Sequence, residues 1–141
     1  MERNILVPID QSDQATKALE YALEEYPDEH ITALHVLQLD STATHGDEGF
    51  LYRDEFLEQL HEASEERLET ARERAADQGV EIDTELVRGE PTRAITEYVE
   101  DNDIDHVVIG SHGRSGPTRV LLGSVAEAVT RRAPVPVTTV R

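Results

Sequence analysis

The sequence contains no cysteine and no tryptophan, and only one of its 13 basic side chains is a lysine, Lys17. Without cysteine there can be no disulfide bond, no zinc site with cysteine ligands and no thiol nucleophile. Aromatic residues make up only 4% of the chain, so the core must consist mainly of valine, leucine, isoleucine and alanine. No apolar run approaches membrane-spanning length, and the first residues, MERNILV, do not have the pattern of a signal peptide. A cytoplasmic protein without membrane contact is expected.

Positive charge is scarce as well. The chain has 30 acidic and 13 basic side chains, which gives a formal net charge of -17 at pH 7. Such acidity disfavours binding to DNA, RNA or anionic membranes, because their phosphates would be repelled. We expect adaptation to high salt, as in an extreme halophile, with a heavily solvated surface as the alternative explanation of this charge. In 1 M salt the screening length falls to about 3 Å, so the repulsion among the acidic side chains is largely removed.

Short apolar runs typical of buried strands alternate with longer stretches that have helical spacing. Strands are expected at residues 4–10, 30–38, 80–89, 104–110 and 135–141. The first helix is expected from Ser12 to about Pro27, and the second is expected to end at about Gln78, with Gly79 just beyond it. The third helix is expected to begin at about Pro91. The fourth is expected to begin at Ser124, and Glu127 completes the spacing of a capping box there. The apolar faces expected for the first two helices are Ala15, Ala18, Leu19, Ala22, Leu23 and Tyr26, and then Leu57, Leu60, Leu68, Ala71 and Ala75.

This alternation of strands and helices predicts one domain over residues 1–141, with a parallel sheet covered by helices on both faces. Pro136 cannot donate a ladder hydrogen bond, so the last strand is expected at an edge of the sheet. Ligands of such sheets bind beyond the carboxyl ends of the strands, where the strand order reverses. Asp10 and Gly110 stand at the two strand ends that this rule selects.

The stretch GSHGRSGPTRVLLGS, residues 110–124, contains Gly110, Gly113 and Gly123 in the pattern G-x2-G-x9-G, followed by Ser124. A missing side chain at Gly110 would let a ligand approach the backbone, and Gly113 can adopt the positive φ of an anion-binding nest. Gly123 and Ser124 precede a helix, whose first N–H groups favour phosphate. A long turn, with Ser124 as an ordinary helix cap, is the alternative.

Other catalytic and binding motifs are missing. There is no G-x4-G-K-[ST] phosphate loop, no G-x-G-x-x-G after the first strand and no G-x-S-x-G nucleophile elbow. Ser115 has only His112 as a neighbouring base in the sequence, so no catalytic residue is assigned. The histidines at 30, 35, 45, 61 and 106 form no H-x3-H pair, and no metal site is predicted.

GSHGRSGPTRVLLGS closely resembles the nucleotide-binding signature of the universal stress protein family, in the branch that binds ATP. The resemblance extends over the whole chain, through NILVPIDQSDQA, ALHVL, RGEP and PVPVTTVR. It implies a three-layer α/β/α fold with a five-stranded parallel sheet in the order 3-2-1-4-5. This is the adenine nucleotide alpha hydrolase-like, or Rossmann-like, topology. It also implies a homodimer formed through the last strand, residues 135–141.

The same resemblance implies an ATP site at named positions. Asp10, with Pro8 and Ile9, would lie against the adenine and ribose, and the backbone of Val36 would contact the adenine edge. Ile109 and Gly110 would line the ribose side, while the phosphates would be held by Gly113, Gly123, Ser124 and Val125. His112 and Arg114 lie within the loop and are further candidates for phosphate binding, with exposed loop residues as the alternative. For Asp10 the alternative is a cap of the following helix.

We therefore expect an ATP-binding protein that acts as a nucleotide-dependent regulatory or protective module in the stress response. Whether magnesium or manganese accompanies ATP is left open. The alternatives are a dimeric scaffold of the same fold that binds no nucleotide, and a slow ATPase. Turnover is not predicted, because there is no phosphate-loop lysine and no evident base for the γ-phosphate. The segment 40–54 is long for a connection, and it is either a lid over the nucleotide or a solvated loop.

Overall fold

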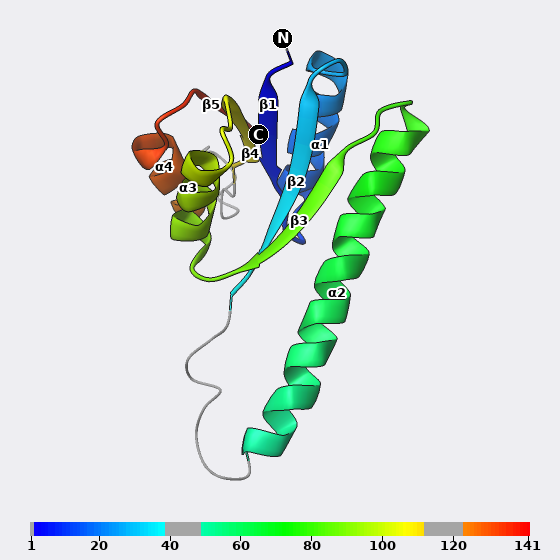
Figure 1. The fold of residues 1–141 in the computed structure, drawn as a ribbon, viewed down its shortest axis with the longest axis vertical. Helices are drawn as coiled ribbons and strands as arrows, with labels where there is room; N and C mark the ends of the chain where they lie inside the picture. The colour runs from blue at the N-terminus through cyan, green and yellow to red at the C-terminus, as the bar shows by residue number, and fades with distance from the viewer. Residues whose placement is uncertain (1, 39–48, 112–122) are drawn as a thin grey trace, which may run out of the picture.

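The computed structural model of the chain describes residues 2–38, 49–111 and 123–141. Strands and helices alternate along it from the first element to the last (Figure 1). The strands are β1 (Asn4–Pro8), β2 (His30–Leu37), β3 (Asp83–Arg88), β4 (His106–Gly110) and β5 (Val137–Val140). The helices are α1 (Asp13–Glu25), α2 (Gly49–Asp77), α3 (Pro91–Asp101) and α4 (Ser124–Arg132).

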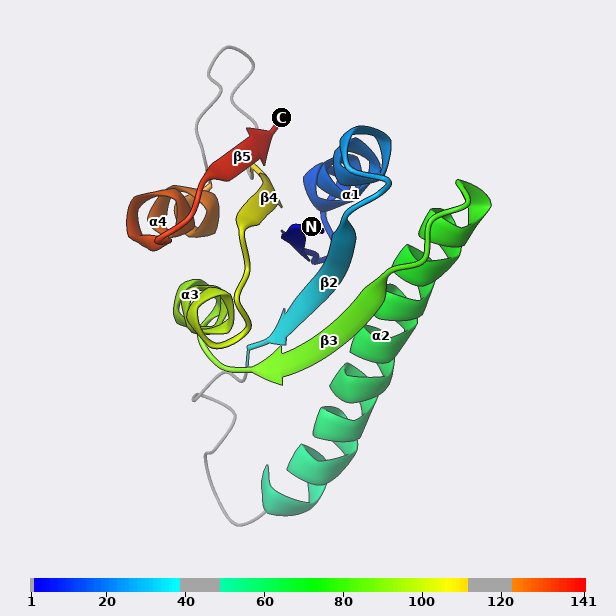
Figure 2. The ribbon, with the colours of Figure 1, turned by 45° about the horizontal axis from the view of Figure 1, so that its top comes forward.

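The five strands form one parallel sheet in the order β3-β2-β1-β4-β5, which confirms the predicted fold. Figure 2 shows α1 and α2 on one face of the sheet and α3 and α4 on the other. β5 lies at an edge, as the missing N–H of Pro136 predicted. Within the described residues, no helix is long and apolar enough to span a bilayer.

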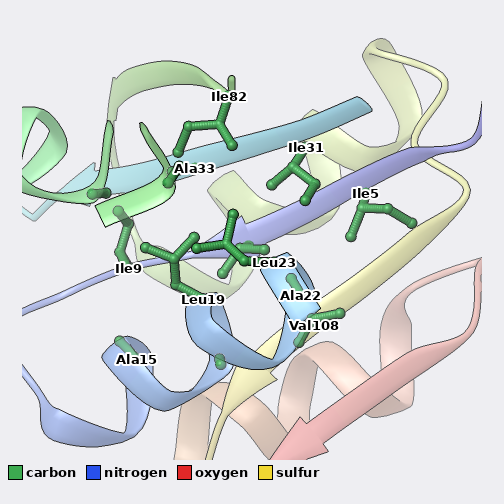
Figure 3. Close-up of a cluster of buried hydrophobic side chains, with 14 of the residues drawn as sticks. Ile5, Ile9, Ala15, Leu19, Ala22, Leu23, Ile31, Ala33, Ile82 and Val108 are labelled. Atoms are coloured by element: carbon green, nitrogen blue, oxygen red, sulfur yellow. The ribbon is translucent and has the colours of Figure 1, made fainter. Parts of the chain in front are cut away.

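The core on the α1 side is built from small and branched aliphatic side chains (Figure 3). Helical spacing predicted the buried face of α1, and five of those positions are buried: Ala15, Ala18, Leu19, Ala22 and Leu23. They pack against Ile5, Val7, Ile31 and Ala33 of the central strands. Burying a leucine of this kind stabilises the fold by about 1.5–3 kcal/mol. The alanines let α1 lie close to the sheet, which matters for Gly110 below.

A second core lies on the opposite face of the sheet, because alternate residues of a strand point to opposite faces. Leu6, Leu34, Val107 and Ile109 contribute to it from the strands. The helices cover them with Ile95 and Val99 of α3 and Ala126 and Val129 of α4. The central strands β1 and β4 are thus buried on both faces.

Helix α2 is 29 residues long and packs on the sheet mainly through its C-terminal half. Leu68, Ala71 and Ala75 are buried, whereas Leu57 and Leu60 are only half-buried. Figure 1 shows the first turns of α2 extending beyond the sheet. The connection predicted at 40–54 is shorter than expected, because α2 already begins at Gly49. Residues 40–48, the remaining part of the expected lid, lie outside the described residues.

Three helix ends lie where capping residues, proline or glycine in the sequence predicted them. Ser12 is the N-cap of α1, and its hydroxyl accepts a hydrogen bond from the N–H of Ala15 at 3.1 Å. Pro91 is the first residue of α3, as expected, with Glu90 as the N-cap. Gly79, just beyond α2, has a φ of 75°, the left-handed conformation that terminates many helices.

Candidate functional site

The sheet opens at the carboxyl end of its central strand, β1. The ladder between β1 and β4 is short, pairing Ile5 with His106 and Leu6 with Val107. Pro8 has no N–H to continue it, so the two strands separate beyond this point. The chain leaves β1 for α1 on one face, and the segment after β4 leads to α4 on the other face. A crevice at this switch point follows from the topology.

A cleft of about 580 Å³ occupies this position. Its size is typical of small-molecule sites, which range over roughly 300–1,000 Å³. The strand ends form its floor, and side chains from the four helices contribute to its walls. Of the predicted site residues, those that line the cleft are Pro8, Ile9, Asp10, Val36, Ile109, Gly110 and Val125. The structure thus brings together residues from β1, β2, β4 and α4 that are far apart in the sequence.

The predicted phosphate-binding positions are described only in part. His112, Gly113 and Arg114 lie outside the described residues. Gly123 and Ser124 stand at the start of α4, next to the cleft-lining Val125. The prediction that Ser124 caps this helix is wrong, because Gly123 is the N-cap and Ser124 is the first helical residue.

The start of α4 therefore has no capping box. The pattern S-x-x-E is present in the sequence, but α4 begins at Ser124, one residue earlier than a capping box with Ser124 as the N-cap requires. The first N–H groups of any helix have no intrahelical acceptor, and within the described ranges no side chain caps the first turn of α4. Glu127, the acidic residue of that turn, forms an ion pair with Arg131. The pairing reduces the repulsion that Glu127 would exert on an anion at this helix end.

Asp10 organises the turn from β1 into α1. One carboxylate oxygen, Oδ1, accepts hydrogen bonds from the N–H of Ser12 at 2.8 Å and from its hydroxyl at 2.5 Å. Ser12 in turn caps α1 through Ala15. The structure therefore contains the capping interaction that was one of the two interpretations of Asp10. Contact between Asp10 and a ligand stays a prediction.

Gly110 is a glycine for a reason that the sequence pattern did not indicate. A Cβ atom at this position would lie 2.5 Å from both the carbonyl carbon and the oxygen of Gln14, and 2.8 Å from the nitrogen of Ala15. The first turn of α1 thus passes directly over the end of β4. A side chain at residue 110 is excluded by this helix, whether or not a ligand is bound.

His35 lines the cleft and was missed by the sequence prediction, which considered the histidines only as metal ligands. Its ring is buried, with 7% of the residue exposed, and Nδ1 lies 2.8 Å from the carbonyl oxygen of Ile9. Because a carbonyl only accepts, Nδ1 carries the proton and Nε2 of the neutral ring is an acceptor. Burial lowers the pKa of His35, against an opposing effect of the hydrogen bond to Ile9. A histidine within an otherwise apolar strand, ITALHVL, was the available signal.

Arg67 of α2 is a second residue that the sequence did not identify. It is half-buried, lines the cleft and also lines a neighbouring hollow of about 440 Å³ between α1 and α2. Among the described cleft-lining residues, Arg67 is the only arginine or lysine and Asp10 is the only carboxylate. In the sequence Arg67 stands among glutamates, in ASEERLET, a pattern typical of a solvated helix face, so no sequence feature selects it.

The described ranges contain no group of three or more histidine, aspartate or glutamate side chains placed to hold a metal ion. The described part of the cleft instead offers apolar walls, backbone groups at strand ends, the guanidinium of Arg67 and a helix start that no described side chain caps. These features suit binding of a flat, partly apolar molecule that carries an anionic group.

Comparisons with known proteins agree with this architecture. Residues 1–141 match the family model described as Universal stress protein family. Universal stress protein YxiE of Bacillus subtilis is 34% identical over 148 residues, with 100% of both chains covered. Universal stress protein UspA from Lactobacillus plantarum, a solved structure, has a TM-score of 0.84 at 30% identity, covering 99% of this chain and 97% of that chain.

A universal stress protein family protein from Arabidopsis thaliana, solved with AMP bound, has a TM-score of 0.71. It is 22% identical, and 98% of this chain and 90% of that chain are covered, so it shows the shared fold. The family match and the identity to YxiE both extend over the whole chain. The chain therefore belongs to the universal stress protein family.

Proposed function

We propose that this chain binds adenine nucleotides, ATP among them, in the cleft at the carboxyl ends of β1 and β4. The observation that carries the proposal is the convergence of Asp10, Val36, Gly110 and Val125 on one cleft of about 580 Å³. Each of these residues belongs to the set that the resemblance assigned to ATP. As a single domain over residues 1–141, the protein acts in the cytoplasm as a nucleotide-dependent regulatory or protective module of the stress response.

The walls of the cleft fit a purine base. Ile9, Val36, Ile95 and Ile109 supply apolar surface from both sides of the sheet end. A base held between such side chains loses contact with water, which is favourable, and its polar edge must then find partners in the protein. The backbone of Val36 is the nearest candidate for that edge, as argued below. The ribose would lie toward Asp10 and Gly110.

The start of α4 fits the phosphates. The first N–H groups of a helix and its dipole favour an anion, and no side chain of the described segments caps α4. Gly113, Gly123, Ser124 and Val125 would hold the phosphates, and His112 and Arg114 would lie beside them. Magnesium or manganese would compensate phosphate charge if it accompanies ATP. The AMP bound to the structural relative from Arabidopsis thaliana supports an adenine nucleotide as the ligand.

The second candidate function is a dimeric scaffold of the same fold, and the free edge of β5 favours its dimeric part. The residues from Val137 to Val140 are all half-buried, and the outer side of an edge strand presents unpaired N–H and C=O groups. We propose that residues 135–141 pair with a second copy of the chain. Dimerisation and nucleotide binding use different parts of the molecule and are compatible.

Calorimetric titration at high salt with ATP, ADP and AMP tests nucleotide binding. The wild type is expected to bind, and Gly113→Val and Gly123→Val are expected to abolish binding, because a branched side chain fills the proposed phosphate site. Gly79→Ala is the control, since Gly79 lies beyond α2 and outside the cleft lining. A wild type that binds none of the three nucleotides would leave the scaffold function. A turnover assay with magnesium or manganese then separates a nucleotide sensor from a slow ATPase.

A further inference from the structure

The ladder between β1 and β2 ends in an unusual way at the floor of the cleft. The N–H of Ile9 donates to the carbonyl of Leu34 at 2.8 Å, so the polar groups of Leu34 face β1. Alternate residues of a strand direct their backbone groups to the same side, so Val36 faces β1 as well. The next residue, Leu37, faces β3, because its carbonyl accepts from Gly89 at 3.2 Å.

In a regular parallel ladder the next hydrogen bond would run from the N–H of Val36 to the carbonyl of Ile9. Among the described residues that backbone bond is absent, and the carbonyl of Ile9 accepts from Nδ1 of His35 at 2.8 Å instead. The imidazole thus takes the place of the Val36 amide. It satisfies the carbonyl of Ile9 while the two strands separate.

This substitution leaves a specific recognition element in the cleft. Val36 is half-buried and lines the cleft, and its N–H and C=O point toward the side on which β1 has separated. Within the described ranges neither group has a backbone partner on that side. Buried backbone groups are almost always paired, so a donor beside an acceptor fits a ligand with the opposite arrangement. Adenine has such an edge, with a ring nitrogen acceptor beside an amino donor.

We propose that His35 is a positioning residue for base recognition, which keeps the Val36 amide available to the adenine edge by occupying the carbonyl of Ile9. The proposal rests on the proposed nucleotide-binding function. His35 itself need not touch the nucleotide. Without the imidazole, the carbonyl of Ile9 would draw in the N–H of Val36, the ladder would lengthen by one bond and the cleft would lose that donor.

Two substitutions separate this role from a merely structural one. His35→Leu keeps an apolar side chain of similar bulk but removes the donor. His35→Asn keeps the donor, because the side-chain amide nitrogen of asparagine stands close to the position of Nδ1. If His35 only filled space, leucine would be the better replacement. If it positions Val36, asparagine rescues and leucine does not.

The first readout is hydrogen exchange of the Val36 amide, measured by NMR without ligand. In the wild type and in His35→Asn this amide is expected to exchange rapidly, unlike the paired amides of β2. In His35→Leu it is expected to be protected at least about tenfold, because it joins the ladder. Slow exchange of Val36 in the wild type would overturn the proposal, and this result requires no variant to fold.

The second readout is the preference for AMP over IMP, in which a carbonyl replaces the amino group of adenine. The wild type and His35→Asn are expected to prefer AMP about tenfold, the effect of one or two hydrogen bonds. In His35→Leu the preference is expected to fall to about twofold or less. Equal loss of affinity for both nucleotides, with the preference retained, would mean a structural role and would overturn the proposal. A wild type that binds neither nucleotide would instead overturn the proposed function itself.

Discussion

Single atoms decide the geometry of the cleft at several positions. The missing side chain of Gly110 admits the first turn of α1, the missing N–H of Pro8 ends the ladder to β4, and Nδ1 of His35 occupies the carbonyl of Ile9. Each of these features acts on the backbone and not through a side chain that contacts a ligand. The shape of the site is therefore sensitive to substitutions that change little in volume or charge.

Gly110→Ala tests the packing of α1 over β4. The added Cβ would meet backbone atoms of Gln14 and Ala15 at 2.5–2.8 Å, and backbone cannot move aside as a flexible side chain can. We expect a loss of about 1–3 kcal/mol or more in the free energy of unfolding, measured by urea denaturation. Gly79→Ala is the control, because a Cβ there meets nothing within 4 Å. Its only destabilising effect is the strain of a positive φ in a residue with a side chain. A Gly110→Ala variant as stable as the wild type would contradict the close approach of α1.

Buried His35 predicts a pH dependence of stability. Burial lowers the pKa of His35 in the folded protein, whereas the unfolded chain has the ordinary value of about 6.5. The unfolded state therefore binds the proton more readily, so this stabilisation is fully present above about pH 6.5 and is lost as the pH falls through the folded pKa. Burial, with Arg3 nearby, also lowers the pKa of His106 and acts in the same direction.

Urea denaturation between about pH 7.5 and 5 measures this effect, with His35→Asn as the comparison. The free energy of unfolding of the wild type is expected to fall more steeply with decreasing pH than that of the variant. The charge of Arg67 lowers the pKa of His35 and the charge of Asp10 raises it, so these two effects oppose each other. The difference between the two pH profiles therefore reports mainly the burial of the imidazole. Parallel pH profiles of the two proteins would contradict this account of His35.

At the scale of helices and strands, the predicted pattern agreed with the structure where the signal was local and periodic. The alternation of β1, α1 and β2 and the buried face of α1 follow from apolar spacing alone. The start of α2 was placed too late, because no cap or proline marks Gly49 in the sequence. The start of α4 was misjudged because S-x-x-E also occurs where the chain does not use it as a cap.

The two serines near the cleft test this difference between helix starts. Ser12→Ala is expected to lower the free energy of unfolding by about 1 kcal/mol, because it removes the cap of α1 and a partner of Asp10. Ser124→Ala is expected to change it by less than about 0.5 kcal/mol, since Ser124 makes no capping bond. Urea denaturation of both variants is the measurement. Equal losses would show that Ser124 does cap α4.

At the scale of the whole molecule, the cleft exists only because strands distant in sequence pair in one sheet. The order of the strands could be expected from the family resemblance, and with it the convergence of Asp10, Val36 and Gly110. His35 and Arg67 could not be selected, because their importance depends on contacts with Ile9 and on the path of α2 across the sheet. Contacts between residues far apart in the chain produce no local sequence pattern, whereas the spacing of apolar residues in a helix or strand does.

The net charge of -17 predicts a stability that depends strongly on salt. Described surface ion pairs such as Arg93 with Glu97 and Arg72 with Glu69 each contribute at most about 1 kcal/mol, so repulsion among the many carboxylates dominates. We expect the melting temperature to rise when KCl is raised from about 0.1 to 2 M, because screening shortens to about 3 Å or less. A neutral osmolyte at matched osmolality is the control. A melting temperature that does not rise with salt would contradict the adaptation to high salt that the composition predicts.

The central claim is that an adenine nucleotide binds at the carboxyl ends of β1 and β4, and NMR titration of backbone amides with ATP at high salt tests it most directly. We predict saturable shifts for the amides at residues 9, 10, 36, 109–110 and 123–125, which lie at or next to the cleft. Amides at the opposite end of the sheet, around Arg3 and His106, are expected to stay unchanged. Shifts confined to that opposite end, or no shifts at millimolar ATP, would contradict the account.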